Sequence, residues 1–390
     1  MVFKIITLGC KLNFAESSAL GKVLLERGHR RAKPGEQADL CIVNTCTVTD
    51  TADHKDRQAI HRIKRENPNA RVIVTGCYAR LKPQEIAEMV EVDHVIPKRE
   101  DRFVHAWSKD DRTRCFLKVQ DGCDYFYSYC TIPLARGRSR NPRIEEVCIQ
   151  AKEALASGAK EMVLTGVNIG DFGKSTGEHF IDLLRALDNL GEMEYRIRIS
   201  SCEPNLLSDE IIDFVASSRH FAPHFHIPLQ SGNNEMLAIM RRRYTRELFK
   251  ERVEHIHRVM PNAFIGVDCM VGVLGETEER WEDYLRFVES LPVSQLHVFT
   301  YSERANTRML TMDLPVIPQK ERERRSQILH AVSEQKTQAF YAAHRGEQAT
   351  VLWESKKTAD ALMFGFTENY IKVSAPYDKS KTNTFEQIVI

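Results

Sequence analysis

The sequence has no long apolar run. No stretch approaches the roughly 18–20 consecutive apolar residues that a membrane-spanning helix needs. The N-terminus also lacks the basic start, long apolar region and small-residue cleavage site of a signal peptide. A large net charge is missing too, since 55 Lys and Arg residues stand against 54 Asp and Glu residues. These absences argue against a membrane partner and against a general attraction to polyanions, and we expect a cytoplasmic protein.

Charge is nevertheless uneven along the chain. Four stretches are basic: "RGHRRAK" (27–33), "KDRQAIHRIKR" (55–65), "ARGRSRNPR" (135–143) and "MRRRYTR" (240–246). Any one of them is typical of a solvated helix face or loop. Four such stretches together raise the hypothesis of a surface that binds RNA or phosphate.

Strand and helix patterns divide the chain into three segments. Residues 1–105 alternate apolar runs with helices, which predicts a Rossmann-like parallel α/β sheet, with Asn13 capping a first helix over 14–28. Residues 106–346 hold six further strand candidates separated by helices, and that number favours a partial (β/α)6 barrel over a closed barrel of eight. Residues 347–390 contain short runs with turns, which predict a small β-barrel.

Three cysteines share one local context in the first segment. Cys10, Cys46 and Cys77 end the runs "TLGC", "VNTC" and "VTGC", each at the close of an expected strand. In a parallel sheet such strand ends lie on one edge, where ligands bind. Three soft thiolates suit an iron–sulfur cluster or zinc and leave one metal position open. Simple burial is the alternative, and it is the interpretation for Cys41, Cys115 and Cys148.

A second pair of cysteines follows the first strand of the second segment. In "DGCDYFYSYC" (121–130), Cys123 and Cys130 are separated by six residues. A thiol at position 127 would complete the pattern C-x3-C-x2-C, but Tyr127 stands there. The loop after a barrel strand faces the active site.

These motifs resemble the radical S-adenosylmethionine (SAM) methylthiotransferases over nearly the whole chain. The resemblance is carried by "LGCKLN" (8–13), "VNTCTVT" (43–49), "VTGCYA" (74–79), "QDGCDYF" (120–126), "CTIPLARGRSR" (130–140), "LTGVNIGDFG" (164–173), "RISSCEPN" (198–205), "HIPLQSGNNEMLAIMRRRYT" (226–245), "VFTYSERANT" (298–307) and "MFGFTENYIKV" (363–373). Several of them are most similar to the branch that acts on N6-threonylcarbamoyladenosine at position 37 of tRNA. The isopentenyladenosine branch and the ribosomal-protein branch are the alternatives.

The resemblance implies two [4Fe–4S] clusters, SAM, an electron donor and a tRNA anticodon loop as partners. Cys10, Cys46 and Cys77 would hold the auxiliary cluster, and the 121–130 loop would hold the cluster that binds SAM. A SAM-derived radical would then remove the hydrogen from C2 of adenine, and the auxiliary cluster would deliver a methylated sulfur. Such a C–H bond has no acidic proton, so a radical cofactor is needed. The terminal barrel would be of the RNA-binding TRAM type.

Tyr127 departs from the family pattern. A phenol is harder than a thiolate and carries its oxygen farther from Cα, so we expect a radical SAM cluster that is absent or unstable and an activity that is impaired. Another cysteine could replace the missing ligand only if its thiol lies close to this loop. Cys202 and Cys269 are the candidates, because they stand nearest to the ends of expected barrel strands. A non-catalytic RNA-binding protein of the same fold is therefore a second hypothesis.

Five residues at or just after expected barrel strands are candidates for SAM contact: Gly166, Asn168, Glu203, Gln230 and Asp268. Gly166 would allow close approach of the backbone to SAM, or would serve only as a turn residue. The alternative for the polar residues is that they cap helices or stabilise loops.

Overall fold

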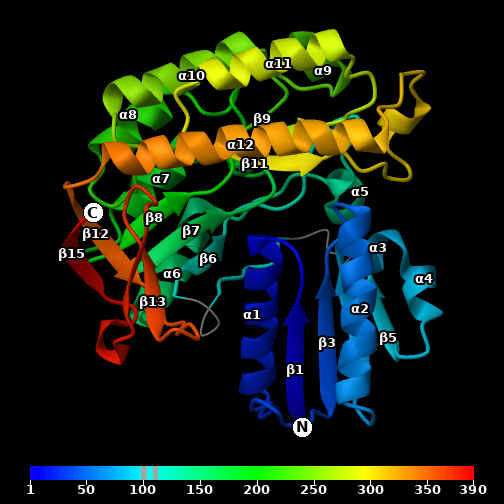
Figure 1. Cartoon of the computed structure of the whole chain (residues 1–390). Helices are drawn as coiled ribbons and strands as arrows, with labels where there is room; N and C mark the ends of the chain where they lie inside the picture. The colour runs from blue at the N-terminus through cyan, green and yellow to red at the C-terminus, as the bar shows by residue number, and fades with distance from the viewer. Residues whose placement is uncertain (98–102, 109–112) are drawn as a thin grey trace.

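Five parallel strands form the N-terminal sheet in the computed structural model, which describes residues 1–97, 103–108 and 113–390 (Figure 1). The strand order is β2-β1-β3-β4-β5, with β1 (Val2–Thr7), β2 (Arg30–Arg31), β3 (Leu40–Thr45), β4 (Arg71–Gly76) and β5 (His94–Pro97). The helices of this segment are α1 (Lys11–Glu26), α2 (Asp50–Glu66), α3 (Cys77–Leu81) and α4 (Pro83–Ala87). The expected parallel α/β sheet is confirmed.

The first helix begins earlier than the sequence predicts. Cys10, not Asn13, occupies the N-cap position of α1, and Asn13 lies buried inside the helix. The Asn13 side-chain amide donates to the carbonyl oxygens of Leu8 at 2.8 Å and of Thr45 at 3.0 Å. The prediction that Asn13 caps the helix is wrong because this side chain ties together the ends of β1 and β3.

Six parallel strands follow one another in the second segment. They form two three-stranded sheets, β6-β7-β8 and β9-β10-β11, and single bridges from Ile197 to Phe221 and from Ser201 to His226 link the two. The strands are β6 (Cys115–Lys118), β7 (Glu161–Thr165), β8 (Arg196–Ile199), β9 (His224–Gln230), β10 (Phe264–Val271) and β11 (Gln295–Thr300). All six strand candidates are confirmed as parallel strands.

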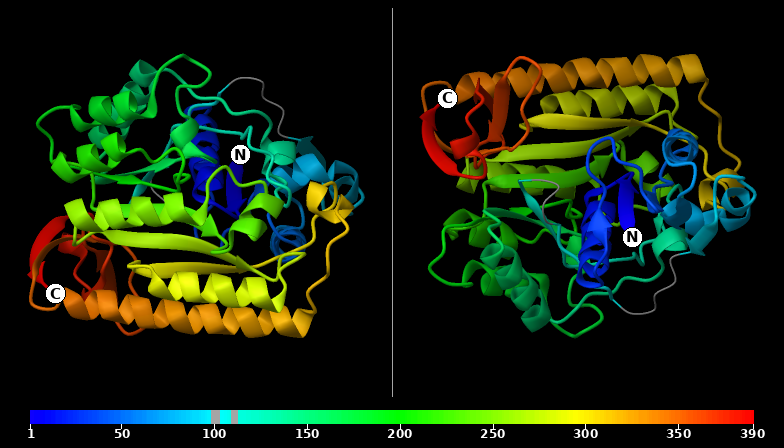
Figure 2. Two further views of the ribbon diagram at one scale, coloured as in Figure 1. Left: turned by 90° about the horizontal axis from the view of Figure 1, so that it is seen from above. Right: turned by 90° about the horizontal axis from the view of Figure 1, so that it is seen from below.

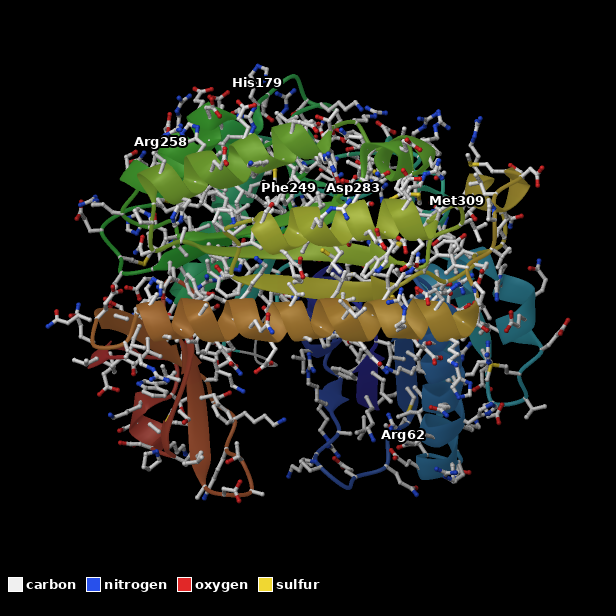
Figure 3. All side chains as sticks on the ribbon, turned by 45° about the horizontal axis from the view of Figure 1, so that its top comes forward. Arg62, His179, Phe249, Arg258, Asp283 and Met309 are labelled. Carbon is white, nitrogen blue, oxygen red and sulfur yellow. The ribbon has the colours of Figure 1, made fainter. Side chains whose placement is uncertain are left out.

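Helices cover one face of these strands, with the main apolar core between them. The helices are α5 (Ile132–Arg136), α6 (Ile144–Ala156), α7 (Phe180–Asp188), α8 (Asp209–Ser217), α9 (Asn234–Ile239), α10 (Arg246–Val259), α11 (Glu278–Ser290) and the long α12 (Gln319–Ala343). Phe225 of β9 belongs to this core. So does Phe249 of α10, which is labelled in Figure 3. None of the helices in the described ranges is long and apolar enough to cross a membrane.

The opposite face of the six strands, here called the inner face, carries Phe116, Val163, Arg198, His226 and Asp268. These residues alternate with core residues along their strands, because successive strand residues point to opposite faces. Helix α1 packs there, with the rings of Phe14 and Phe116 6.4 Å apart. Figures 1 and 2 show the N-terminal segment beside this face.

The C-terminal segment is a curled antiparallel sheet of four strands. Its order is β14-β13-β12-β15, with β12 (Gln348–Trp353), β13 (Leu362–Phe366), β14 (Lys372–Pro376) and β15 (Phe385–Val389). Arg196 and Arg198 of β8 donate to backbone carbonyls of this segment, at 2.6 Å to Thr350 and 3.1 Å to Glu368. Buried arginines therefore join the last segment to the six strands.

Candidate functional site

Cys10, Cys46 and Cys77 stand at one edge of the N-terminal sheet. They follow β1, β3 and β4, which are neighbouring parallel strands. The strand order reverses at β1, and ligands bind beside such a reversal in open α/β sheets. A Cβ atom on Gly9 would lie 2.8 Å from the Sγ atom of Cys46, so the segment before Cys10 lies directly against Cys46. The fold thus brings the three predicted residues together, and their role as ligands stays a prediction.

Burial disfavours a free thiolate at Cys46. Burial raises the pKa of Cys46 to about 12, and the Cys10 and Cys77 thiols raise it as well. A metal would reverse this effect, because a coordinating thiol loses its proton. Across the described ranges, no three His, Cys, Asp or Glu side chains are placed to hold a single metal ion. A cluster bound through a separate iron at each thiolate is the donor arrangement that three such cysteines fit.

The second cysteine loop is held firmly at both ends. Gly122 has φ +72°, and a Cβ atom there would lie 1.9 Å from the carbonyl oxygen of Arg138, so only glycine fits. The Cys123 amide donates to the carbonyl of Gly137 at 3.0 Å. At the far end, the Ser128 hydroxyl donates to the carbonyl of Ile239 at 2.8 Å. The positions of Cys123 and its neighbours are therefore fixed by the backbone.

Tyr127 fills the centre of this loop. Its ring lies edge-on to Tyr125 with centroids 5.6 Å apart, and parallel to Tyr129 at 6.3 Å. The guanidinium of Arg242 lies 4.0 Å from the Tyr127 ring centroid. The hydroxyl is buried and has no hydrogen-bond partner among the described residues. Burial raises the Tyr127 pKa far above its ordinary value, although Arg242 opposes the shift.

These observations test whether the loop fits a cluster bound by three cysteines. Only two thiols, Cys123 and Cys130, belong to the pattern, and burial raises the pKa of both. Tyr127 offers a neutral phenol packed against a cation, and a phenol is not a thiolate ligand. The loop does not fit the three-thiolate arrangement.

Cys202 and Cys269 are the two cysteines that the sequence places nearest to the ends of barrel strands. Both side chains belong to the main apolar core between strands and helices. Tyr127 and Cys123 belong to a separate small cluster. A Cβ atom on Gly170 would lie 3.1 Å from the Sγ atom of Cys202, so that thiol packs against the backbone of the 169–171 turn. Both cysteines therefore pack as small core residues.

Two of the SAM candidates carry buried amide groups without partners. Within the described part of the chain, neither side-chain amide atom of Asn168 forms a hydrogen bond, and Oε1 of Gln230 has no partner. Gln230 ends β9 with φ +65°, a left-handed conformation that aims its side chain away from the regular strand direction. Buried polar atoms are almost always paired in native proteins, so both amides are available to a ligand.

The other three candidates have partners or close neighbours. The Arg242 guanidinium donates to both oxygens of Glu203, at 2.9 and 3.1 Å. Asp268 lies within β10 rather than after it, and its Oδ1 atom is 2.6 Å from Nε2 of His226. A Cβ atom on Gly166, directly after β7, would lie 2.9 Å from the Gln120 side chain, so the position requires a small residue.

Sequence reasoning missed the burial of two arginines. Arg136 and Arg242 stand in two of the four basic stretches, which predict either a solvated surface or a surface for RNA or phosphate, yet both side chains are almost fully buried. Arg136 donates to Asp121 at 3.0 Å and to Asn13 at 2.5 Å, and so joins the second segment to the first. Arg138 and Arg243, their neighbours in sequence, remain exposed. A basic stretch shows composition only, and it does not reveal which arginine turns inward.

Comparison with known proteins matches two family models to the chain. The model described as "Uncharacterized protein family UPF0004" covers residues 2–97, and the one described as "Radical SAM superfamily" covers residues 117–288. The first match contains the three strand-end cysteines and the second contains the 121–130 loop. Fold, site and family matches together define a radical SAM protein.

Relatives of similar length show to which family of radical SAM proteins the chain belongs. The threonylcarbamoyladenosine tRNA methylthiotransferase MtaB of Bacillus subtilis is 37% identical over 94% of this chain and 88% of its own. The protein of that name from Aquifex aeolicus is 35% identical over 94% and 95%. A tRNA-2-methylthio-N(6)-dimethylallyladenosine synthase of Desulfitobacterium hafniense is 29% identical over 99% and 94%. The chain belongs to the radical SAM methylthiotransferase family.

Solved structures agree on the fold. The radical SAM methyltransferase TsrM of Kitasatospora setae aligns with a TM-score of 0.53 at 15% identity, over 77% of this chain and 74% of that one. The cobalamin-dependent radical SAM enzyme OxsB aligns with a TM-score of 0.52 at 11% identity, over 87% and 56%. At such low identity these likenesses concern the fold alone.

Proposed function

We propose that this protein adds a 2-methylthio group to N6-threonylcarbamoyladenosine at position 37 of tRNA. One observation carries the choice of substrate: relatives named for threonylcarbamoyladenosine are 32–37% identical. Relatives named for dimethylallyladenosine are 28–29% identical over similar lengths. Activity on dimethylallyladenosine or on a ribosomal protein is the alternative within the family.

The N-terminal cysteines are proposed to hold an auxiliary iron–sulfur cluster. Cys10, Cys46 and Cys77 supply the thiolates, and the cluster, when bound, supplies the sulfur for transfer. Gly9 keeps the Cys10 segment against Cys46, since a side chain there would collide with it. Asn13 holds the ends of β1 and β3 at fixed spacing through its two donated hydrogen bonds.

SAM is proposed to bind where the six strands end, next to the 121–130 loop. Asn168 and Gln230 offer unpaired amide groups there. Glu203 offers a carboxylate oriented by Arg242. Gly166 and Asp268 are proposed as two further SAM contacts. An electron donor is required as a partner for reductive chemistry of SAM.

Tyr127 is proposed to impair that chemistry in this chain. Two thiolates remain where the family uses three, and the phenol packs as an aromatic partner of Arg242. The second candidate function, a non-catalytic RNA-binding protein of the same fold, rests on this observation.

The segments are proposed to act as three domains. Residues 1–105 would carry the auxiliary cluster, residues 106–346 would form a partial (β/α)6 barrel for SAM, and residues 347–390 would form a TRAM-like barrel that contacts the tRNA. The antiparallel order β14-β13-β12-β15 supports the last assignment, because small antiparallel barrels are common oligonucleotide-binding folds.

The test compares the natural chain with Tyr127→Cys after anaerobic iron–sulfur reconstitution. Tyr127→Cys should hold about eight irons per chain and cleave SAM to 5′-deoxyadenosine, whereas the natural chain should hold about four and cleave little. Tyr125→Cys is the matched control, because it adds a thiol to the same loop outside the ligand pattern. Equal iron content and equal SAM cleavage in the natural chain and Tyr127→Cys would refute the role of Tyr127.

The substrate is tested separately with Tyr127→Cys. Defined tRNAs carrying threonylcarbamoyladenosine, isopentenyladenosine or unmodified adenosine at position 37 are incubated with SAM and a reductant, and the nucleosides are analysed by mass spectrometry. Methylthiolation of the threonylcarbamoyl tRNA alone supports the proposal. Product only from the isopentenyl tRNA would assign the chain to the other branch.

A further inference from the structure

Phe126 stands on the outer side of the 121–130 loop. It is 40% exposed, whereas its neighbours Tyr125 and Tyr127 are buried. Those two tyrosines form a small apolar cluster with Cys123 and nearby residues, and Phe126 is not among the described members of that cluster. Packing against apolar side chains of the protein therefore does not account for a phenylalanine at this position.

The backbone of Phe126 is strained as well. Its φ of +48° is left-handed, a conformation that is disfavoured for a residue with a bulky side chain and that glycine and asparagine adopt more easily. Residues held in such a conformation tend to cluster at sites that bind ligands. A ring that is both exposed and carried on a strained backbone points to a partner outside the chain.

Guanidinium groups lie against the aromatic rings of this loop. The Arg138 guanidinium is 5.0 Å from the centroid of the Phe126 ring, and the Arg138 side chain is 77% exposed. The Arg243 guanidinium is 3.9 Å from the centroid of the Tyr125 ring and donates to the backbone carbonyl of Asp124 at 3.2 Å. The exposed ring therefore has one arginine beside it and a second on the adjacent residue.

The exposed charge at this surface is positive. Asp124 lies 3.4 Å from Arg138 and 3.1 Å from Lys174, but its own side chain is 19% exposed against 49% for Lys174. Asp171 lies within electrostatic range of Lys174 and is 7% exposed. Arg243 forms no ion pair in the part of the chain that the structure describes. The cations thus reach solvent, while the carboxylates lie beneath them.

An exposed ring among cations favours single-stranded RNA as the partner. Unpaired bases stack on aromatic rings, and arginine and lysine bind the phosphates that flank those bases. A protein partner would need an interface of about 1,000 Å² with an apolar centre. Here a single ring is surrounded by charged side chains, which fits one base and its phosphates better.

We propose that Phe126 stacks on a base next to position 37 of the tRNA anticodon loop, while Arg138 and Arg243 bind the adjacent phosphates. The inference rests on the proposed function. Cys123 and Cys130 belong to the same loop as Phe126, so an RNA strand on this surface passes beside the proposed SAM site. An enzyme that acts on a base takes that base out of the stack. Phe126 then replaces the stacking that a neighbouring base loses, and it is a positioning residue.

Binding and fluorescence test this proposal without turnover. Anticodon stem-loops with threonylcarbamoyladenosine or isopentenyladenosine at position 37 are titrated with protein in the absence of SAM. Two further stem-loops carry 2-aminopurine at position 36 or at position 38, because stacking on an aromatic ring changes the fluorescence of that base. The proteins are the natural chain, Phe126→Leu, Phe126→Trp and Ile149→Ala. Ile149 of α6 is 51% exposed, so its substitution removes exposed apolar surface away from the loop.

Phe126→Leu should weaken binding of the threonylcarbamoyl stem-loop about tenfold, because leucine is apolar but has no ring on which a base can stack. Ile149→Ala should leave the affinity unchanged. Phe126→Trp should bind at least as tightly as the natural chain and should quench 2-aminopurine at one of the two positions. Thermal unfolding of Phe126→Leu should match that of the natural chain, since the replaced ring is exposed.

The phosphate contacts are tested by the salt dependence of binding. Arg138→Gln should reduce the slope of log K against log salt concentration by about 1, as loss of one phosphate contact implies. Lys152→Gln removes the same charge from an exposed position on α6 and should leave the slope unchanged. An unchanged slope for Arg138→Gln would contradict the phosphate contact.

Two results would overturn the role of Phe126. Equal affinities of the natural chain and Phe126→Leu would show that the ring does not contact the RNA, and would assign the surface to a protein such as the electron donor. Absence of quenching by Phe126→Trp at both 2-aminopurine positions would exclude stacking beside position 37. A natural chain that prefers the isopentenyl stem-loop would instead overturn the proposed substrate. That failure appears in the natural protein, whereas failure of the Phe126 proposal appears only in the variants.

Discussion

The guanidinium of Arg242 lies 4.0 Å from the ring centroid of Tyr127, and both side chains are buried. The same guanidinium donates to the carboxylate of Glu203. Tyr127 is therefore stacked on a cation that a buried anion holds in place. Cation–π contacts of this kind gain strength when the cation is desolvated. Position 127 thus stabilises a charged network at the place where the family motif requires a metal ligand.

Arg242→Leu should destabilise the protein by about 3–5 kcal/mol, because it leaves Glu203 buried without its partner. Urea denaturation followed by circular dichroism measures the free energy of unfolding. Arg242→Leu combined with Glu203→Gln should recover part of the loss. The exposed neighbour Arg243 provides the control, and Arg243→Leu should cost less than about 1 kcal/mol. An Arg242→Leu protein as stable as the natural chain would contradict the importance of this pair.

Cys46→Ser should lose the iron bound by the N-terminal segment, whereas Cys41→Ser should retain it. Both cysteines are buried, but Cys41 packs in the core inside β3 and Cys46 stands at the strand end. Iron and sulfide are measured after reconstitution of each protein. Equal iron in the two variants would show that the strand-end cysteines do not hold a cluster.

Gly122→Ala should destabilise the 121–130 loop more than Gly158→Ala destabilises its own turn. Both glycines have positive φ, so each alanine costs about 1–2 kcal/mol in backbone conformation. Only the Cβ atom at Gly122 also collides with backbone, at 1.9 Å from the Arg138 carbonyl oxygen. Limited proteolysis of the loop and the free energy of unfolding report the difference. Equal effects would mean that the loop can move away from the 137–138 backbone.

Glu161→Gln should destabilise the protein by about 3–5 kcal/mol near neutral pH, because it leaves Arg196 and Arg198 buried with a weaker partner. Burial alone would raise the pKa of Glu161, but Arg198 and Arg196 outweigh it and hold the pKa at about 2.

A lowered carboxyl pKa contributes stability above the ordinary value of 4.5 and loses it as the pH falls toward about 2. The difference between natural chain and Glu161→Gln, measured by urea denaturation, should therefore shrink on acidification from pH 7 to pH 3. Glu194→Gln, at an exposed position, should show neither the loss nor the pH dependence. A difference that is constant with pH would contradict this account.

Much of the architecture could be predicted because it depends on local patterns. The six central strands are short apolar or alternating runs bounded by turn residues, and Cys10, Cys46 and Cys77 meet because parallel strands end on one edge. The burial of Arg242 could not be predicted in this way. Its partner Glu203 stands 39 residues earlier, and only the packed fold brings the two together.

The start of α1 shows a second limit of sequence reasoning. Asn13 is a favourable N-cap residue, and a local rule places the helix after it. In the structure its amide bonds to Thr45, which is 32 residues away. Such relationships depend on tertiary contacts that the local sequence does not encode.

The bonds from Arg196 and Arg198 to the C-terminal segment affect how deletion experiments should be interpreted. A chain cut after α12 would leave both guanidinium groups paired with Glu161 but without the Thr350 and Glu368 carbonyls. Such a truncated protein would be inactive for reasons of stability, whatever the segment does with tRNA. Substitutions on the outer surface of the four-stranded sheet are therefore the sound way to separate RNA recognition from the integrity of the six-stranded unit.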